Sequence, residues 1–206
     1  MKGIRVGVPP PRWSVPPNSN LLVAGDRSVS FELNLRSFTE ILTVPDSGPQ
    51  LVVKCVQAEA SADWFRCPGP TDSLTLAVLS PDPVTKKWDN PKILLLDDDA
   101  RSFEVGEIRF VNISAKIVLV KLGAKVFGIR PERSLVKPIG VGSHPVLLGY
   151  LDGQEQELIW ENQISVPEGQ RVQCFFYNSK RSGTRGTVRP RIVTEPIPVL
   201  PEKRGN

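Results

Sequence analysis

The sequence is poor in the residues that most catalytic and redox sites need. Its 206 residues include one histidine, one methionine and three cysteines. A blue-copper site needs two histidines, a cysteine and usually a methionine, so cupredoxin chemistry is excluded. A Ser-His-Asp or Cys-His site would have to use His144, whose loop sequence GVGSHPV contains no nucleophile motif such as G-x-S-x-G. We therefore predict that the protein is not an enzyme and has no catalytic residues.

Metal-binding patterns are also missing. Cys55, Cys67 and Cys174 lie in separate segments without C-x-x-C spacing, so a structural zinc site is not expected. A single bridge between Cys55 and Cys67 remains open. The acidic run at 97–99 is the best candidate for calcium, but it lacks the spacing of a calcium loop, and a turn explains it more simply. We predict neither a metal site nor another cofactor.

Long hydrophobic runs do not occur. No stretch approaches the roughly 20 apolar residues of a membrane-spanning helix. The segment at 1–20 begins with a basic residue but has no apolar core of signal-peptide length. We expect the cell envelope or the extracellular space if a signal peptide has been removed from this sequence, and the cytoplasm is the alternative.

Short apolar runs separated by turn residues dominate the chain. Its 20 prolines and 16 glycines are scattered between these runs, as in proteins built from many short strands. Val29, Phe31 and Leu33 alternate with polar residues, which indicates a half-buried strand. The predicted strands are 29–36, 50–57, 73–80, 92–97, 107–114, 116–122, 125–129, 133–138, 145–151, 156–162, 171–178 and 187–193. The pair Asp152-Gly153 is the strongest hairpin signal.

This pattern predicts an all-β protein, specifically an antiparallel immunoglobulin-like β-sandwich. Residues 58–65 form the only plausible helical turn. We expect three parts: an extended Pro-rich arm at 1–25, a sandwich domain at 26–194 and a tail at 195–206. The arm is a candidate for docking onto a neighbouring subunit. No internal repeat is clear enough to predict two copies of a smaller unit.

Asn112 occupies an unusual place for an asparagine, inside the predicted strand 107–114. A buried amide is costly unless its donors and acceptor find partners. We therefore predict a structural role in which Asn112 bonds to the backbone of a neighbouring loop, with Ser114 beside it.

The stretch FEVGEIRFVNISAKIVLVKLGAKVFGIRPERSLVKP, residues 103–138, resembles bacterial immunoglobulin-like sandwich proteins of unassigned activity. These proteins carry a pattern of the type F-x-x-G-x-x-R-x-x-N-x-S, followed by a glycine turn and a proline-containing turn. The matching positions here are Phe103, Gly106, Arg109, Asn112, Ser114, Gly123 and Pro131. The resemblance covers about a sixth of the chain. It implies an exported envelope or surface component, in some cases linked to fimbria or pilus assembly.

The positive charge is concentrated at the carboxyl end. Residues 178–206 carry a local charge of +5, within a total of +4 for the chain. Arg185 and Arg189 in this segment could contact an anionic surface or a nucleic acid. No aromatic residue lies in this segment beyond Asn178, so stacking on bases is not supported and we do not expect a nucleic-acid partner.

The tryptophans suggest a second alternative. Trp64 and Trp88 could form a sugar-stacking surface for a carbohydrate-binding or glycan-processing module, although covering loop ends is the simpler role. Our leading hypothesis is a non-enzymatic structural or adhesive component of a bacterial cell envelope. It would act through a protein partner or through self-association, using loops or an exposed sheet edge.

Overall fold

The computed structural model of the chain describes residues 2–7, 16–17, 19–24, 27–33, 38–44, 50–57, 60–71, 73–82, 85, 87–179 and 187–200. All of its regular elements in these ranges are strands, which confirms the prediction of an all-β protein. None of the described residues forms a helix of the length and apolarity that a membrane crossing requires.

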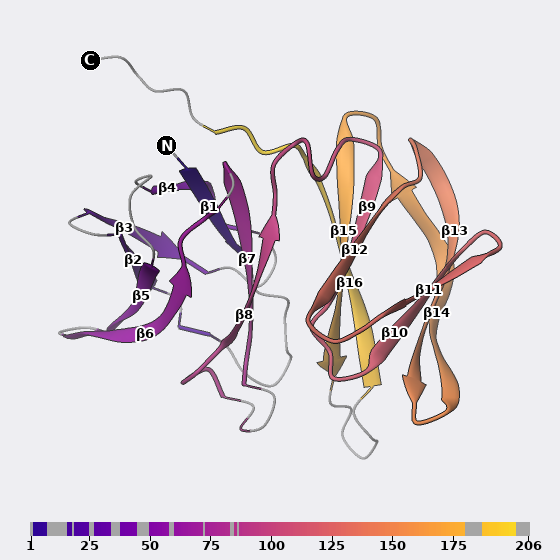
Figure 1. The fold of residues 1–206 in the computed structure, drawn as a ribbon, viewed down its shortest axis with the longest axis horizontal. Coiled ribbons are helices and arrows are strands. Elements are labelled where there is room, and N and C mark those ends of the chain that lie inside the picture. The colour runs from indigo at the N-terminus through magenta and orange to yellow at the C-terminus, as the bar shows by residue number, and fades with distance from the viewer. Residues whose placement is uncertain are drawn as a thin grey trace. The chain divides into compact units, whose positions relative to one another are not determined.

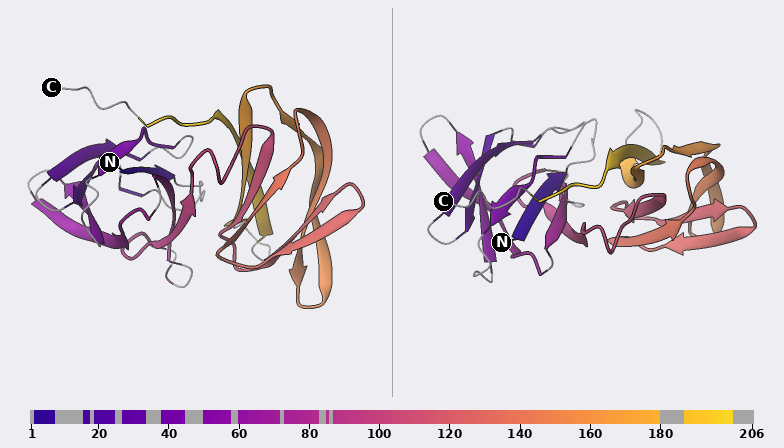
Figure 2. Two further views of the ribbon diagram at one scale, coloured as in Figure 1. Left: turned by 45° about the horizontal axis from the view of Figure 1, so that its top comes forward. Right: turned by 90° about the horizontal axis from the view of Figure 1, so that it is seen from above.

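The chain divides into two compact units. The first contains Met1–Pro10, Ser14–Asp99 and Pro198–Asn206, and the second contains Pro11–Trp13 and Ala100–Ile197. Each unit is built from two four-stranded sheets, shown in Figures 1 and 2.

The first unit contains strands β1 to β8. Their bounds are β1 Lys2–Gly7, β2 Ser19–Ala24, β3 Arg27–Glu32, β4 Leu42–Val44, β5 Gln50–Gln57, β6 Ala60–Pro68, β7 Leu74–Ser80 and β8 Lys92–Asp97. One sheet has the order β4-β1-β7-β8 and the other has the order β3-β2-β5-β6. Residues from both sheets, among them Ile4, Leu22 and Val53, share one hydrophobic core.

The second unit contains strands β9 to β16. Their bounds are β9 Glu107–Asn112, β10 Ile117–Leu122, β11 Lys125–Ile129, β12 Arg133–Pro138, β13 Gly142–Asp152, β14 Glu155–Val166, β15 Gln170–Ser179 and β16 Thr187–Pro196. The sheets have the orders β12-β9-β15-β16 and β11-β10-β13-β14. Phe110, Val120 and Leu148 contribute to their shared core.

The two units have the same strand topology. Adding eight to each strand label of the first unit gives the two sheets of the second unit, strand for strand. The one parallel pairing of described strands in each unit also matches, because β1 pairs with β7 and β9 pairs with β15. We infer that the chain contains two structural copies of one eight-stranded unit.

A β-bulge marks the same place in both copies. The β5–β6 pairing shifts register directly after Val53, and the β13–β14 pairing shifts directly after Leu148. These two residues also face equivalent strands, since Val53 pairs with Leu22 of β2 and Leu148 pairs with Val120 of β10. Positions at equal distances from the two bulges are therefore structurally equivalent.

The predicted division into an arm and one sandwich differs from this structure. Residues Lys2–Gly7 lie inside the first unit as β1, between β4 and β7, and Ser19–Ala24 forms β2. Both segments are short, and the prolines beside them directed the prediction towards an extended arm. The prolines at positions 9–11 lie outside the described residues. The predicted tail is in part a strand, because β16 extends to Pro196.

Two further details differ from the sequence predictions. Ala60–Pro68 forms β6, so the described part of the expected helical turn at 58–65 is a strand. The sheets are also not purely antiparallel, because of the pairings β1–β7 and β9–β15. The Asp152-Gly153 turn joins β13 to β14 as expected, and Gly153 has the positive φ of 67° that such a turn requires.

Candidate functional site

Asn112 is buried at the end of β9, where its carboxamide joins three backbone segments. Its Nδ2 donates to the carbonyl oxygens of Lys116 and Ile129, each at 2.8 Å. Its Oδ1 accepts from the backbone N–H of Ser114 at 2.9 Å and from the Ser114 hydroxyl at 2.7 Å. Both residues therefore have a structural role, tying the end of β9 to the start of β10 and the end of β11.

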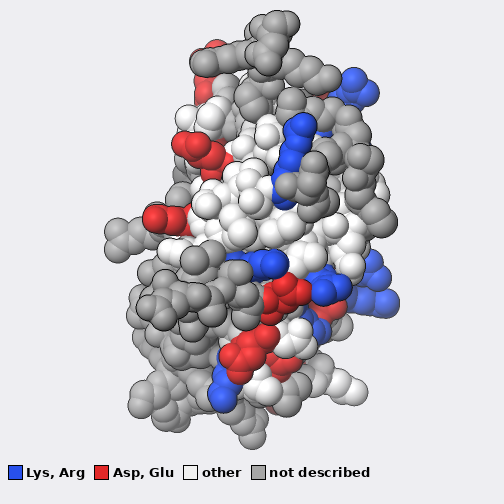
Figure 3. Space-filling view, turned by 90° about the vertical axis from the view of Figure 1, so that its left-hand side faces the viewer, with Lys and Arg blue, Asp and Glu red and all other residues white. Residues whose placement is uncertain are grey.

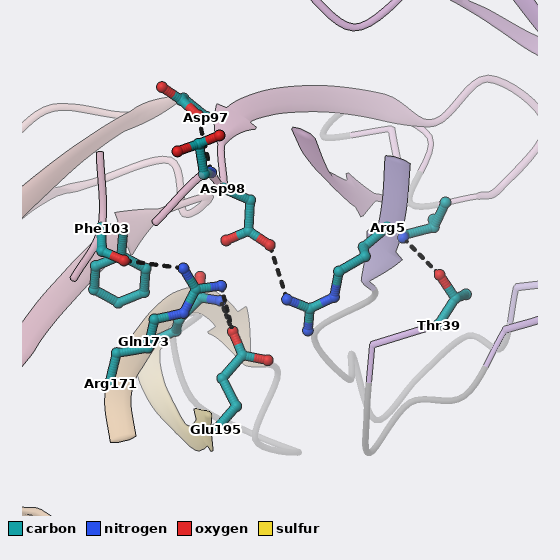
Figure 4. A network of polar contacts seen from close by, with 10 residues as sticks. Arg5, Thr39, Asp97, Asp98, Phe103, Arg171, Gln173 and Glu195 are labelled. Carbon is teal, nitrogen blue, oxygen red and sulfur yellow. Dashed lines mark hydrogen bonds and ion pairs between the residues drawn. The ribbon is translucent and has the colours of Figure 1, made fainter. Parts of the chain in front are cut away.

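The first unit contains a buried ion pair (Figure 4). Arg5 Nη1 of β1 donates to Asp98 Oδ2 at 2.8 Å, and the guanidinium lies 4.8 Å from the centre of the Phe38 ring. The side chains of Arg5 and Asp98 are 7% and 0% exposed. Because both charges are withdrawn from solvent and paired, removing either partner would leave an uncompensated buried charge, and we assign the pair a structural role.

The second unit contains a comparable cluster, also drawn in Figure 4. Arg171 of β15 donates to Glu195 Oε1 of β16 and to the carbonyl oxygen of Phe103, each at 3.1 Å. Gln173 donates to the same carboxylate oxygen at 2.7 Å. The Phe103 ring lies under two guanidinium groups, those of Arg109 and Arg171. This cluster is buried and internally bonded, so we assign it a structural role.

The two tryptophans proposed for sugar binding pack together. Trp64 is half-buried and Trp88 belongs to the core of the first unit. Their ring centres lie 6.3 Å apart, and Trp64 Nε1 donates to the backbone carbonyl of Trp88. Packing of this kind uses the indole faces within the protein, which agrees better with the loop-covering role than with a sugar platform.

The remaining candidates from the sequence lie apart from one another. Arg189 is half-buried on β16, whereas Arg185 lies outside the described residues. His144 Nε2 lies 3.0 Å from the carbonyl oxygen of Gly140. In the acidic run at 97–99, Asp98 binds Arg5 and Asp99 accepts from Ser73. Within the described part of the chain, no group of three or more His, Cys, Asp or Glu side chains is placed so that it could hold a metal ion.

All three cysteines are free thiols, which answers the open question of a bridge between Cys55 and Cys67. Cys55 pairs with Ala62 across the β5–β6 hairpin, and Cys67 pairs with Leu51 at its other end. Burial raises the pKa of Cys67 to about 11 and also raises the pKa of Cys174. A buried thiol with a raised pKa is a weak nucleophile, so these two residues are structural.

The outer face of the sheet β11-β10-β13-β14 carries exposed apolar residues. Side chains on strands alternate, so the neighbours of the buried residues Val118 and Val120 point away from the core. On this face Ile117 is 37% exposed, and Val126 and Leu158 are each 60% exposed. Leu119, Leu147 and Leu151 are half-buried on the same face. Exposed apolar residues gathered on one sheet are typical of protein-binding surfaces.

A groove of about 470 Å³ lies beside these residues. It is lined by Lys121 of β10, by Pro145 and Leu147 of β13, and by Glu161 and Gln163 of β14. Lys121 faces Leu147, which in turn faces Glu161, so the groove crosses three neighbouring strands and reaches the edge of the sheet.

That edge is β14, which pairs with β13 alone among the described strands (Figure 1). It is twelve residues long and contains no lysine, arginine or proline. Its three glutamates, Glu155, Glu157 and Glu161, are exposed. We use the name β14 surface for Ile117, Leu147 and Leu158 of the outer face together with Glu161 and Gln163 of the edge strand. The β14 surface is the candidate functional site.

Sequence reasoning did not select any residue of the β14 surface. The strand at 156–162 was predicted, but strand order cannot be read from one sequence. An edge strand is identified by its missing neighbour, so the useful signal was the absence of lysine and proline in 155–166.

Charges on the first unit form a mixed pattern. Figure 3 shows Lys and Arg interspersed with Asp and Glu around uncharged surface on the face that it displays. The described residues on this face do not form a patch of one sign, which is the feature that a nucleic acid or an anionic surface would require.

Comparison with known proteins does not assign this chain to a family. No protein-family profile matches the sequence, and no curated protein matches it. Among solved structures, one similar chain is a "putative cell adhesion protein" from Bacteroides eggerthii, with 7% sequence identity and a TM-score of 0.26. The match covers 94% of this chain and 95% of the other. A TM-score this low does not establish a shared fold.

Proposed function

We propose that the protein is a non-enzymatic structural or adhesive component of a bacterial cell envelope, which binds another protein through the β14 surface. The observation that carries this proposal is the combination of an exposed apolar sheet face with an edge strand that has no proline or basic residue. The envelope location is supported by the resemblance of residues 103–138 to exported sandwich proteins.

The proposed binding has two physical sources. Burying Leu158 and its apolar neighbours would remove hydrocarbon from water, which favours association. The backbone groups along β14 would add hydrogen bonds and fix the direction of the partner. A surface of this kind needs no catalytic group, in agreement with the predicted absence of an active site.

A capture experiment tests the proposal. The full chain is immobilised, a bacterial envelope fraction is passed over it, and retained proteins are quantified by mass spectrometry. Leu158→Asp should reduce retention of a specific partner about tenfold or more, because a charged side chain at an interface centre is strongly unfavourable.

Val199→Asp is the matched control, since Val199 is also an exposed apolar residue, 78% exposed, and belongs to the first unit. It should retain the partner at the level of the unmodified chain. Equal retention by Leu158→Asp and Val199→Asp, or no retained protein at all, would contradict the proposal.

Neither alternative function gains support from the described residues. The glycan-binding hypothesis needs exposed indole faces, but Trp88 is 6% exposed and Trp64 packs against it. The nucleic-acid hypothesis depends on Arg185, which lies outside the described residues, and on Arg189, which is half-buried.

A further inference from the structure

We propose that β14 binds an extended, lysine- or arginine-rich segment of the partner protein as an added strand. This inference rests on the proposed function and specifies the chemistry of the partner. It follows from three properties of β14: the direction of its backbone groups, its charge, and its difference from the equivalent strand of the first unit.

The outer half of β14 directs backbone groups away from β13. The N–H of Gln163 donates to Oδ1 of the preceding residue, Asn162, at 2.8 Å. The cross-strand partner of Gln163 is Pro145, which has no N–H. Gln163 and Pro145 are therefore a pair without mutual hydrogen bonds. Pairs with and without mutual hydrogen bonds alternate along an antiparallel ladder, so residues two positions apart are of the same kind. Glu161 and Ser165 therefore present their backbone groups to the same free edge as Gln163.

The equivalent edge of the first unit is protected, and that of the second unit is not. Counted from the bulges, Phe65 of β6 corresponds to Trp160 of β14, because they face Val53 and Leu148. It follows that Arg66 stands where β14 has Glu161, and Pro68 stands where β14 has Gln163. Basic residues and prolines are the usual means of preventing strand addition at an edge.

The acidic residues are also paired differently in the two edges. In β6, Asp63 forms ion pairs with Arg66 at 2.9 Å and with Lys54 at 3.9 Å. Among the described residues, none forms an ion pair with Glu155, Glu157 or Glu161, and these three glutamates give β14 a charge of −3. An added strand carrying lysine or arginine would neutralise this charge.

The same charge argues against a second copy of β14 as the occupant. Antiparallel pairing of two β14 strands would bring together two strands that each carry a charge of −3, and like charges on paired strands are destabilising. A basic segment of a different protein meets no such repulsion. The occupant is therefore expected to be extended, positively charged and free of proline at its centre.

A peptide titration tests this inference on the full chain. The probe is a fluorescein-labelled peptide that alternates lysine with valine and threonine over roughly eight residues, a length that matches part of β14. Its binding is measured by fluorescence anisotropy. The comparison peptide has glutamate at every lysine position.

The test variants transplant the protected edge of the first unit. Glu161→Arg reproduces Arg66, and Gln163→Pro reproduces Pro68, so both residues are already accommodated at these positions by the fold. The control is Glu32→Arg, the same charge change at an exposed residue of another edge strand, β3. Thermal unfolding of each variant verifies that the protein remains folded.

We expect the lysine peptide to bind more tightly than the glutamate peptide and to weaken as salt rises. Each test variant should raise the dissociation constant of the lysine peptide about tenfold or more. Glu161→Arg reverses a charge that attracts the peptide, and Gln163→Pro places a proline ring on the free edge, where it obstructs strand pairing. Glu32→Arg should leave the constant within about twofold.

Three results would overturn the inference. They are the absence of lysine-peptide binding, equal binding by Gln163→Pro and the unmodified chain, and a dimer in light scattering that Gln163→Pro dissociates, which would make the occupant a second copy. The proposed function fails separately. A partner whose capture depends on Leu158 but not on Glu161 or Gln163 would retain the function and reject strand addition.

Discussion

At the scale of single residues, a few buried polar groups determine how the strands meet. The Asn112 carboxamide satisfies two carbonyl groups and two donors at one junction of the second unit. Arg5 and Asp98 serve the first unit as a buried pair. Buried polar groups of this kind cost little while bonded and cost much when one partner is removed.

Replacing Asn112 with alanine should destabilise the second unit by about 3 kcal/mol, because the carbonyls of Lys116 and Ile129 would lose a buried donor. Urea unfolding followed by circular dichroism measures the change. Asn162→Ala, at an exposed asparagine of the same unit, should cost about 0.5 kcal/mol or less. A similar loss in both variants would show that the Asn112 contacts add little.

Cys67 should make the stability of the protein fall at alkaline pH. Its pKa is about 11 in the folded chain against an ordinary value of 9.0, so the unfolded chain loses this proton first as the pH rises. The contribution is complete below pH 9 and is lost as the pH rises towards 11, at about 1.4 kcal/mol per pH unit.

The free energy of unfolding should therefore decline less steeply between pH 9 and 11 in Cys67→Ala than in the unmodified chain. The same slope in Cys67→Ala and in the unmodified chain would exclude desolvation of Cys67 as the cause.

At the scale of elements, β1 is the strand on which the first sheet depends. It pairs with β4 on one side and with β7 on the other, and Ile4 and Val6 enter the core. A central strand contributes two ladders of hydrogen bonds, so its loss cannot be compensated by its neighbours.

A charge at the centre of β1 should unfold the first unit. Ile4 is 1% exposed, and Ile4→Asp would bury an unpaired carboxylate at a cost of about 4 kcal/mol or more. Arg27→Asp, at an exposed position of β3, is the control and should unfold at nearly the original temperature. Tryptophan fluorescence during heating reports the difference, and two similar unfolding curves would contradict the assigned position of β1.

Strand positions could be predicted from alternation, but their roles could not. Val29 and Phe31 predicted β3, and the Asp152-Gly153 pair predicted the turn from β13 to β14. The strand β1 was missed because Lys2–Gly7 is short and is followed by prolines. The edge position of β14 depends on which strands pair across long sequence distances, and local patterns contain no such information.

At the scale of the whole molecule, the chain contains the same eight-stranded unit twice. The duplication was not visible in the sequence because equivalent positions hold different residues, such as Arg66 and Glu161 or Pro68 and Gln163. These differences have a functional meaning in our account. One copy has a protected edge, and the other presents an acidic edge with an apolar face beside it.

The most direct test of this account is amide hydrogen exchange of the full chain, with and without the lysine peptide. We predict that the amides of Glu161 and Ser165 exchange fast in the free protein, since no strand among the described residues pairs on their side, and become protected when the peptide binds. The amides of β6 should not change. Protection that appears elsewhere, with Glu161 and Ser165 unaffected, would contradict the central claim that β14 is the binding edge.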